Sequence, residues 1–248
     1  MDPYAWHLRP EELLAVGLLS VGYVLALRFF PAPAWRKACF ALAMLVLLAA
    51  FETPLETIGL HFLLTGHLLQ NVILAEWAPF LAVAALPPAL AAAIGRVRVI
   101  SFLTNPFVAL PLWLATYFVW HLPPIYDAAL RHSGSLLHLE HASYFVTGLA
   151  LWWPVLQNAP HRLPSGAKAG YLFAGFVLAS PLGLLLALVG KPVYSFYETA
   201  PERLWGLSRI DDQQVAGLTM ASEQAVVFFA VFAFYFWRFF EEEERSVT

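Results

Sequence analysis

Long apolar runs, separated by short joints rich in polar residues and proline, dominate this chain of 248 residues. A membrane-spanning helix needs about 20 largely apolar residues, and fewer when its ends reach the polar interface. By this rule the pattern predicts seven spans, over residues 12–30, 36–55, 61–86, 107–121, 136–156, 169–189 and 215–240. We therefore expect an all-α integral membrane protein, in which a seven-helix bundle forms a single domain over residues 1–248.

The composition supports a membrane protein and excludes several other classes. Hydrophobic residues make up 60% of the chain and charged residues only 12%, whereas a soluble domain has about a quarter charged. A net charge of -3 without a basic stripe argues against nucleic-acid binding. The single cysteine, Cys39, excludes an internal disulfide and a cysteine-rich metal site. HLEH at 138–141 lacks the HExxH spacing of a zinc protease, and with no other catalytic motif we expect no enzyme.

The distribution of basic residues predicts an orientation. Lysine and arginine are more frequent in cytoplasmic loops than in outer ones. The first, third and fifth loops and the C-terminus hold nine of them, and the opposite side holds five. This places the N-terminus outside and the C-terminus in the cytoplasm. On that topology seven of the eight histidines fall on the outer side or in the outer half of a span: His7, His61, His67, His121, His132, His138 and His141.

Four of these histidines are candidate metal ligands. His67 lies in the third predicted span, His121 ends the fourth, and His138 and His141 are spaced i, i+3 at the start of the fifth. Imidazole suits copper, zinc, iron and nickel, and helical bundles build metal sites from facing helices. We predict one outward-facing site from these four, although any single histidine near a helix end also fits a structural role. Further candidates are Met220, Asp212, His61 and Asn71.

Three glutamates lie within or near the predicted spans, where ionisable groups are costly and face the bundle interior. Glu76 and Glu223 are expected deep in the membrane. Each fits a proton relay or a partner that orients an imidazole, and equally a protonated carboxyl bonded to a neighbouring helix. Glu140 points away from the face that His138 and His141 share, so a direct ligand role is not expected for it. It is a third candidate to orient an imidazole or relay a proton.

Several motifs together resemble the integral-membrane CtaG family of cytochrome c oxidase assembly factors, over nearly the whole chain. They are WHLRP at 6–10, GHLLQNVILAEWAPFLAVAALPPAL at 66–90, VWHLPPIYDAAL at 119–130, LLHLEHASYFVTGLALWWPVL at 136–156 and DDQQVAGLTM at 211–220. The chain differs from many members at Asn71, where they have a second histidine, and after Met220, where they have an aromatic residue.

The resemblance implies a non-catalytic factor of the cytoplasmic (inner) membrane that helps to mature the copper centres of a haem–copper oxidase. It implies copper, as Cu(I), as the bound metal. The implied partners are cytochrome oxidase subunits and other copper chaperones, within a bilayer of membrane lipid. Neither the residues nor the resemblance gives the oligomeric state.

Three alternatives remain at the level of sequence. Histidines from facing helices also ligate haem. Glu76 and Glu223 suit a transporter of protons or metal ions. A polar cluster without metal suits a purely structural assembly partner. The loop 191–214, the longest outer connection, is a hypothetical lid over the site.

Overall fold

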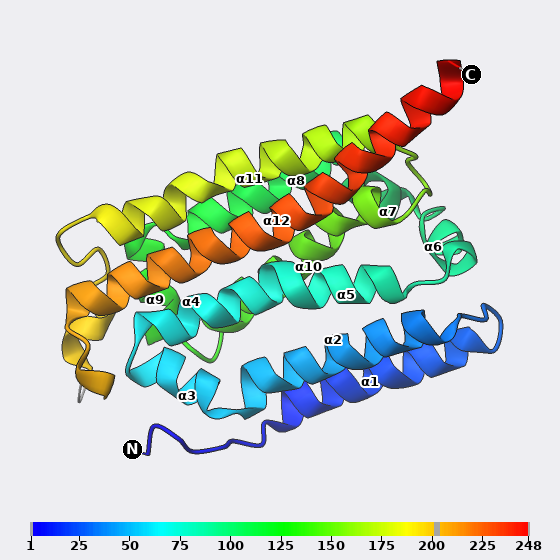
Figure 1. Ribbon diagram of the computed structural model, residues 1–248. Coiled ribbons are helices and arrows are strands. Elements are labelled where there is room, and N and C mark those ends of the chain that lie inside the picture. Colours follow the sequence, from blue (N-terminus) through cyan, green and yellow to red (C-terminus); the bar gives the residue numbers. More distant parts are fainter. Residues whose placement is uncertain (1, 201–203, 248) are drawn as a thin grey trace.

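The computed structural model describes residues 2–200 and 204–247, and within these ranges its regular elements are all helices. Five helices are long and apolar enough to cross a membrane, or six if α8 and α9 count as one bent span. The long helices run along one axis, and the two described chain ends lie at opposite ends of the bundle (Figure 1). The predicted all-helical membrane class is therefore confirmed, whereas the count of seven spans stays a prediction.

The first two helices form an antiparallel pair along one side of the bundle (Figure 1). They are α1 (Pro10–Leu27) and α2 (Ala34–Glu52). The second predicted span, 36–55, extends too far, because Thr53 caps the short helix α3 (Pro54–His61), which begins at a proline. Proline is favoured in the first turn of a helix, where its missing N–H is not needed.

The third predicted span, 61–86, also begins too early. Phe62 and Leu63 interrupt the helix, so His61 ends α3, and α4 covers Leu64–Val72. The segment η1 (Ile73–Trp77) is a π-helical turn, and α5 (Ala78–Ala85) follows. Proline lacks an N–H and crowds the carbonyl four residues earlier. The wider turn before Pro79 is a local adjustment to that proline.

The middle of the chain contains helices that the apolar pattern did not predict. The short helices α6 (Pro88–Ile94) and α7 (Arg98–Leu103) precede α8 (Pro106–Trp120). The chain then bends by 74° into α9 (Pro123–Arg131). Residues 123–131 were expected to be a joint because of Pro123 and Pro124, but prolines at the first two helical positions start a helix rather than preventing one.

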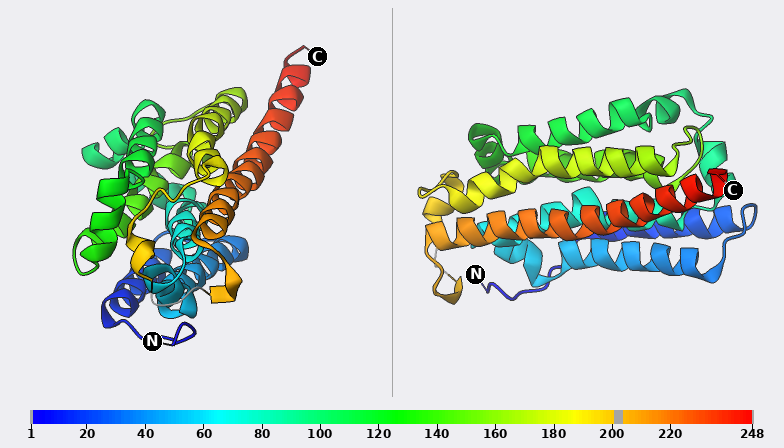
Figure 2. Two further views of the ribbon diagram at one scale, coloured as in Figure 1. Left: turned by 90° about the vertical axis from the view of Figure 1, so that its left-hand side faces the viewer. Right: turned by 45° about the horizontal axis from the view of Figure 1, so that its top comes forward.

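Three long helices complete the bundle. They are α10 (Leu136–Leu156), α11 (Ser165–Leu188) and α12 (Arg209–Val247), with the 3-10 turns η2 (Phe196–Thr199) and η3 (Leu204–Gly206) between the last two. The helix α10 has the bounds of the fifth predicted span, 136–156, although it is not among the helices counted above as long and apolar enough to cross a membrane. The views in Figure 2 agree that α11 and α12 lie side by side. A Cβ on Gly217 would lie 2.5 Å from backbone atoms of α11, so glycine is needed for this close approach.

Candidate metal site

Three of the four predicted histidines are buried in the same part of the bundle. They are His67 of α4, His141 of α10 and His121, which ends α8. The rings of His67 and His141 have centroids 6.0 Å apart. The ring of Tyr126, from α9, contacts both His67 and His121, at 5.4 and 6.2 Å between centroids. Separate helices therefore bring His67 and His141 together, and Tyr126 lies against both His67 and His121.

Glu140 orients His67. Its Oε1 lies 3.4 Å from Nε2 of His67 and accepts a hydrogen bond of 2.9 Å from the side-chain amide of Asn71. Glu140 was expected to orient an imidazole or relay a proton rather than to bind the metal directly, and it is fully buried between α4 and α10, beside His67. A carboxylate that holds one nitrogen of an imidazole fixes the tautomer and leaves the other nitrogen as a metal ligand. Here that other nitrogen is Nδ1 of His67.

His121 is oriented by its own helix. Its Nδ1 donates a hydrogen bond of 2.7 Å to the carbonyl of Tyr117, and the hydroxyl of Tyr144 lies 3.2 Å from the same nitrogen. Because Nδ1 carries the proton that is donated to the carbonyl, Nε2 is the nitrogen that has a free lone pair. This atom is buried and has no hydrogen-bond partner among the described residues.

The nitrogens that face away from these bonds are unsatisfied. Nδ1 of His67, Nε2 of His121 and Nε2 of His141 are all buried without a hydrogen-bond partner in residues 2–200 and 204–247. A buried polar atom without a partner costs about 1–3 kcal/mol, so three in one region need an explanation. Coordination of a metal ion between His67 and His141 would satisfy two of them. The closest unit is the pair His67 and His141, with His121 beyond Tyr126.

His138 lies apart from this buried group. Its side chain is 45% exposed, and its Nε2 lies 3.8 Å from Oε1 of Glu12. Glu11, Glu12 and His138 offer ligand atoms that all lie within 4.8 Å of one another, the only such compact group among the described residues. The structure therefore divides the predicted ligand set between a buried part and a surface part.

An apolar pocket joins the two parts. It has a volume of about 360 Å³ and lies between α1, α2 and α10. Glu11, Glu12 and His138 line it together with the buried His141, and the rest of the lining includes Leu47 and Phe51. His141 thus borders both the pocket and the buried imidazole group.

The further candidates have other surroundings. His61 is exposed and lines a separate small pocket beside Tyr197. Met220 is buried in the apolar core. The side-chain amide of Asn71 is connected to the site through its hydrogen bond to Glu140.

Asp212 has a structural contact that its motif did not suggest. Its two carboxylate oxygens accept hydrogen bonds from the backbone N–H groups of Leu64 (2.9 Å) and Thr65 (3.0 Å), and from the hydroxyl of Thr65 (2.8 Å). These N–H groups belong to the first turn of α4, which has no capping side chain of its own. Asp212 therefore caps the helix that presents His67.

Replacement of Asp212 by alanine is expected to destabilise the protein by about 2 kcal/mol, because a helix cap and a buried charged acceptor are lost together. Thermal unfolding in detergent, followed by circular dichroism, measures the change. The neighbouring Asp211 is exposed and accepts a hydrogen bond from the backbone N–H of Ser208 in its own turn (3.1 Å). It provides the control, because Asp211→Ala removes a local cap but no buried acceptor and should change the unfolding temperature much less. Equal effects of the two replacements would contradict the capping role.

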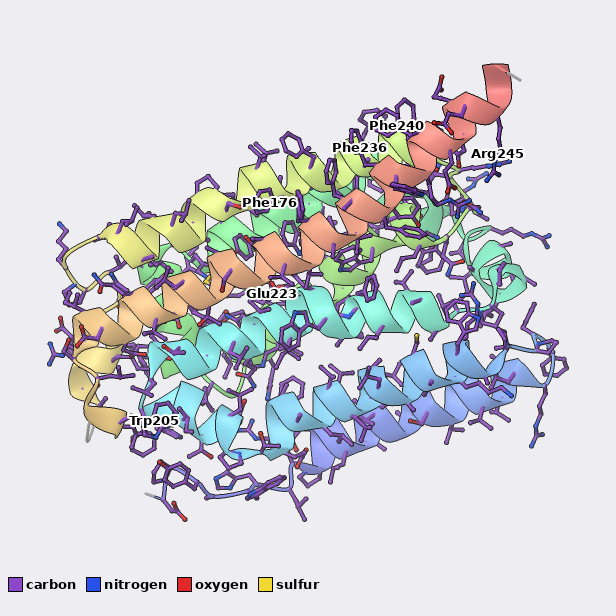
Figure 3. All side chains as sticks on the ribbon, viewed as in Figure 1. Phe176, Trp205, Glu223, Phe236, Phe240 and Arg245 are labelled. Atoms are coloured by element: carbon purple, nitrogen blue, oxygen red, sulfur yellow. The ribbon has the colours of Figure 1, made fainter. Side chains whose placement is uncertain are left out.

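Glu76 and Glu223 form a second buried polar group, deeper in the bundle. Gln224 donates to Oε1 of Glu76 (3.1 Å) and to the hydroxyl of Tyr117 (2.9 Å), and the indole N–H of Trp77 donates to Glu223. Figure 3 labels Glu223 midway along α12, on the side facing the α4–α5 segment. Within residues 2–200 and 204–247 neither glutamate is hydrogen-bonded to an imidazole, and Tyr117 is the residue that links this group to His121.

The loop between α11 and α12 covers the site. Tyr194 stacks on Tyr126 at 3.9 Å between ring centroids, and its hydroxyl donates to the carbonyl of His121 (3.2 Å). Tyr197 donates to the carbonyl of Gly59 (2.6 Å). The lid hypothesis for residues 191–214 is not tested by these contacts, and residues 201–203 lie outside the described range.

Sequence reasoning missed Tyr126, Tyr144 and Glu56. Glu56 of α3 pairs with Arg9 at 2.8 Å and accepts a hydrogen bond from Gln70 of α4. Burial raises the pKa of the Glu56 carboxyl, and Arg9 acts in the opposite direction. A signal for Tyr126 was present in the sequence. It follows His121 by five residues, in the segment that joins the fourth and fifth predicted spans.

Comparison with known proteins supports a family relationship. Two curated proteins, both described as uncharacterized, match the chain with 28% identity over 123 residues, one from Mycobacterium bovis and one from Mycobacterium tuberculosis. The match covers 48% of this chain and only 18% of each relative, so the chain spans a small part of their length. No solved structure matches it.

The family model matches far more of the chain. It is the model of the cytochrome c oxidase caa3 assembly factors, Caa3_CtaG, and it covers residues 21–242. This range includes every helix from α2 to α11 in full. It also includes the four predicted ligands His67, His121, His138 and His141. The chain therefore belongs to the Caa3_CtaG family of cytochrome c oxidase caa3 assembly factors.

Proposed function

We propose that this protein binds copper between its helices and passes it to a cytochrome oxidase subunit during assembly of the copper centres. The observation that supports this most is the pair of buried imidazoles, His67 and His141, with centroids 6.0 Å apart and an unpartnered nitrogen on each. Metal–nitrogen bonds of about 2 Å place two ring centroids roughly 6 Å apart when the ion lies between them. The protein acts here as a non-catalytic carrier of Cu(I), which is held by this pair.

The proposal includes a topology. Seven helical segments cross the cytoplasmic membrane: α1, α2, α4 to α5, α8, α10, α11 and α12. The excess of lysine and arginine in the loops near α6 and α7, and at the C-terminus, supports a cytoplasmic location for that end. The imidazole group then faces the outer side, where α3, α9 and the loop before α12 also lie (Figure 1).

Copper reaches the buried pair through the surface group. Two carboxylates and one imidazole, from Glu11, Glu12 and His138, attract and hold a cation at the mouth of the pocket. The pocket borders His141, so a cation that leaves the surface group meets that imidazole first. His138 accordingly contributes to access rather than to the buried site.

Replacing Glu11 and Glu12 together by glutamine is expected to slow copper uptake about tenfold, because the negative charge that concentrates cations at the mouth is lost. The final occupancy should stay unchanged. Stopped-flow measurement with a Cu(I) indicator separates the two quantities. The control variant is Glu198→Gln with Asp211→Asn. It removes the same amount of negative charge from exposed positions at the same end of the bundle. A variant with normal uptake rate, or with lost occupancy, would contradict this route.

Two measurements test the proposal as a whole. Gently solubilised protein, loaded with Cu(I) and freed of excess metal, should retain copper in elemental analysis. Cells that lack the protein should produce caa3-type oxidase with depleted copper centres, restored by the native chain but not by one lacking His67 and His141. Normal oxidase copper in the deleted cells would contradict a role in copper delivery.

A further inference from the structure

A polar pocket lies at the opposite end of the bundle from the imidazoles. It has a volume of about 530 Å³ and is bounded by the end of α10, the segment 157–164, the start of α11 and the last turns of α12. This volume is within the range of small-molecule sites in proteins, about 300–1,000 Å³. The residues that line it have no contact with the copper site proposed above.

The charge of this pocket is positive. Arg162, Lys168 and Arg238 line it, and Glu242 is the acidic residue among its lining side chains. Glu242 accepts a hydrogen bond of 2.7 Å from the hydroxyl of Ser165. Three cations against one anion leave an excess of two positive charges, which favours an anionic ligand.

Lys168 is the side chain that most needs such a ligand. The residue is only 7% exposed, although it carries an ammonium group. Its Nζ lies 4.8 Å from the centroid of the Tyr235 ring, and it has no hydrogen bond or ion pair with the described part of the chain. A buried cation is costly unless an anion accompanies it, and a cation–π contact offsets only part of that cost.

The start of α11 adds backbone donors. This helix of 24 residues begins at Ser165, its preceding residue is Pro164, and no side chain caps its N-terminus. Ser165 and Pro164 both line the pocket. The first N–H groups of a helix and its dipole favour anions, phosphate in particular.

An apolar groove adjoins the pocket. It has a volume of about 730 Å³ between α11 and α12, and shares Pro164 and Glu242 with the polar pocket. Small residues such as Gly170 line one side, and Phe232 and Phe236 line the other. Figure 3 labels Phe236 on the outer part of α12, before the end of the helix that carries Arg245. A ligand with a hydrocarbon chain beside its anionic group fits both features.

We propose that this pocket binds the phosphate group of an anionic phospholipid, with an acyl chain in the groove between α11 and α12. Arg162, Lys168 and Arg238 pair with the phosphate, and the N-terminus of α11 donates hydrogen bonds to it. Charge-assisted hydrogen bonds to phosphate are among the strong ones. Basic pockets between membrane helices on the cytoplasmic side are suited to such head groups.

The test uses purified full-length protein and three probes: phosphatidylglycerol, phosphatidylcholine and inorganic phosphate. Native mass spectrometry of the detergent-solubilised protein should show phosphatidylglycerol bound about tenfold more tightly than phosphatidylcholine. Millimolar inorganic phosphate should not displace the lipid. Equal binding of the two lipids would overturn the proposal, and displacement by phosphate would show that free phosphate is the ligand.

Matched variants connect the preference to the pocket. Arg162→Gln with Arg238→Gln changes two exposed side chains, so folding should be preserved, and the preference for phosphatidylglycerol should be lost. Lys168→Gln should have the same effect. The control, Arg96→Gln with Arg98→Gln, removes two exposed cations, one just before α7 and one at its first residue, and should keep the preference. An unchanged preference in the pocket variants would overturn the assignment.

Discussion

Replacing His67 and His141 together by alanine is expected to weaken copper binding on the order of 100-fold or more. Even residues that only orient a metal ligand affect affinity by about 10–100-fold, and this change removes two ligands. The physical reason is that Nδ1 of His67 and Nε2 of His141 are the buried nitrogens of the closest imidazole pair. Competition with a Cu(I) chelator of known affinity measures the change.

The matched control for this experiment is the replacement of two exposed histidines. His61→Ala with His138→Ala removes two imidazoles that lie outside the buried group. We expect this variant to retain the affinity of the native protein. Circular dichroism should show that both variants are folded. If the control loses copper while the His67 and His141 variant retains it, the surface group is the binding site and the proposal for the buried pair is wrong.

Adding a single methyl group at Gly148 is expected to destabilise the bundle by about 3 kcal/mol, an upper value for overpacking. A Cβ at this position of α10 would lie 2.3 Å from the carbonyl oxygen of Ala75 in η1. Backbone cannot move aside as a flexible side chain does, so α10 and η1 would have to separate. Because α10 presents His141 and Glu140, this separation would also disturb the metal site.

The comparison with Gly17→Ala isolates the packing effect. A Cβ on Gly17 of α1 would meet no atom within 4 Å. Both changes replace glycine by alanine inside a helix, where alanine is intrinsically favoured by about 1 kcal/mol. Thermal unfolding in one detergent should therefore show a large loss for Gly148→Ala and no loss for Gly17→Ala. Similar unfolding temperatures for the two variants would contradict the close approach of α10 to η1.

Much of the fold follows from the length of apolar runs, and the errors occur where proline was interpreted as a break. The bounds of α10 were predicted to the residue. The helix α9 was missed because Pro123 and Pro124 precede it, although proline also begins helices. The break at Phe62 and Leu63 was missed because apolar residues fill it. Hydrophobicity alone does not distinguish an apolar turn from an apolar helix.

The candidate site was predicted in part. His67, His121 and His141 were expected to meet, and separate helices do bring them into one buried group. His138 lies apart from the other three because of the face that α10 packs against α4. The i, i+3 spacing of His138 and His141 alone does not determine that face. A signal was present, because Leu137, Glu140, Tyr144, Gly148 and Leu151 repeat at helical spacing and are all buried. That stripe includes Glu140 and excludes His138.

The residues that orient the imidazoles were harder to predict, since they come from distant parts of the chain. Asp212 caps α4 by accepting a hydrogen bond from the backbone N–H of Leu64, which lies 148 residues earlier in the sequence. Tyr194 reaches His121 from the loop after α11. Such contacts depend on the tertiary arrangement of helices, which local periodicity does not give.

X-ray absorption at the copper edge of the Cu(I)-loaded protein tests the central claim most directly. The proposed site predicts two nitrogen ligands at about 2 Å, with imidazole scattering, and the loss of this signal in the His67 and His141 variant. Sulfur ligands at about 2.3 Å, from Met220 or Cys39, or oxygen-dominated coordination at the surface group, would contradict it.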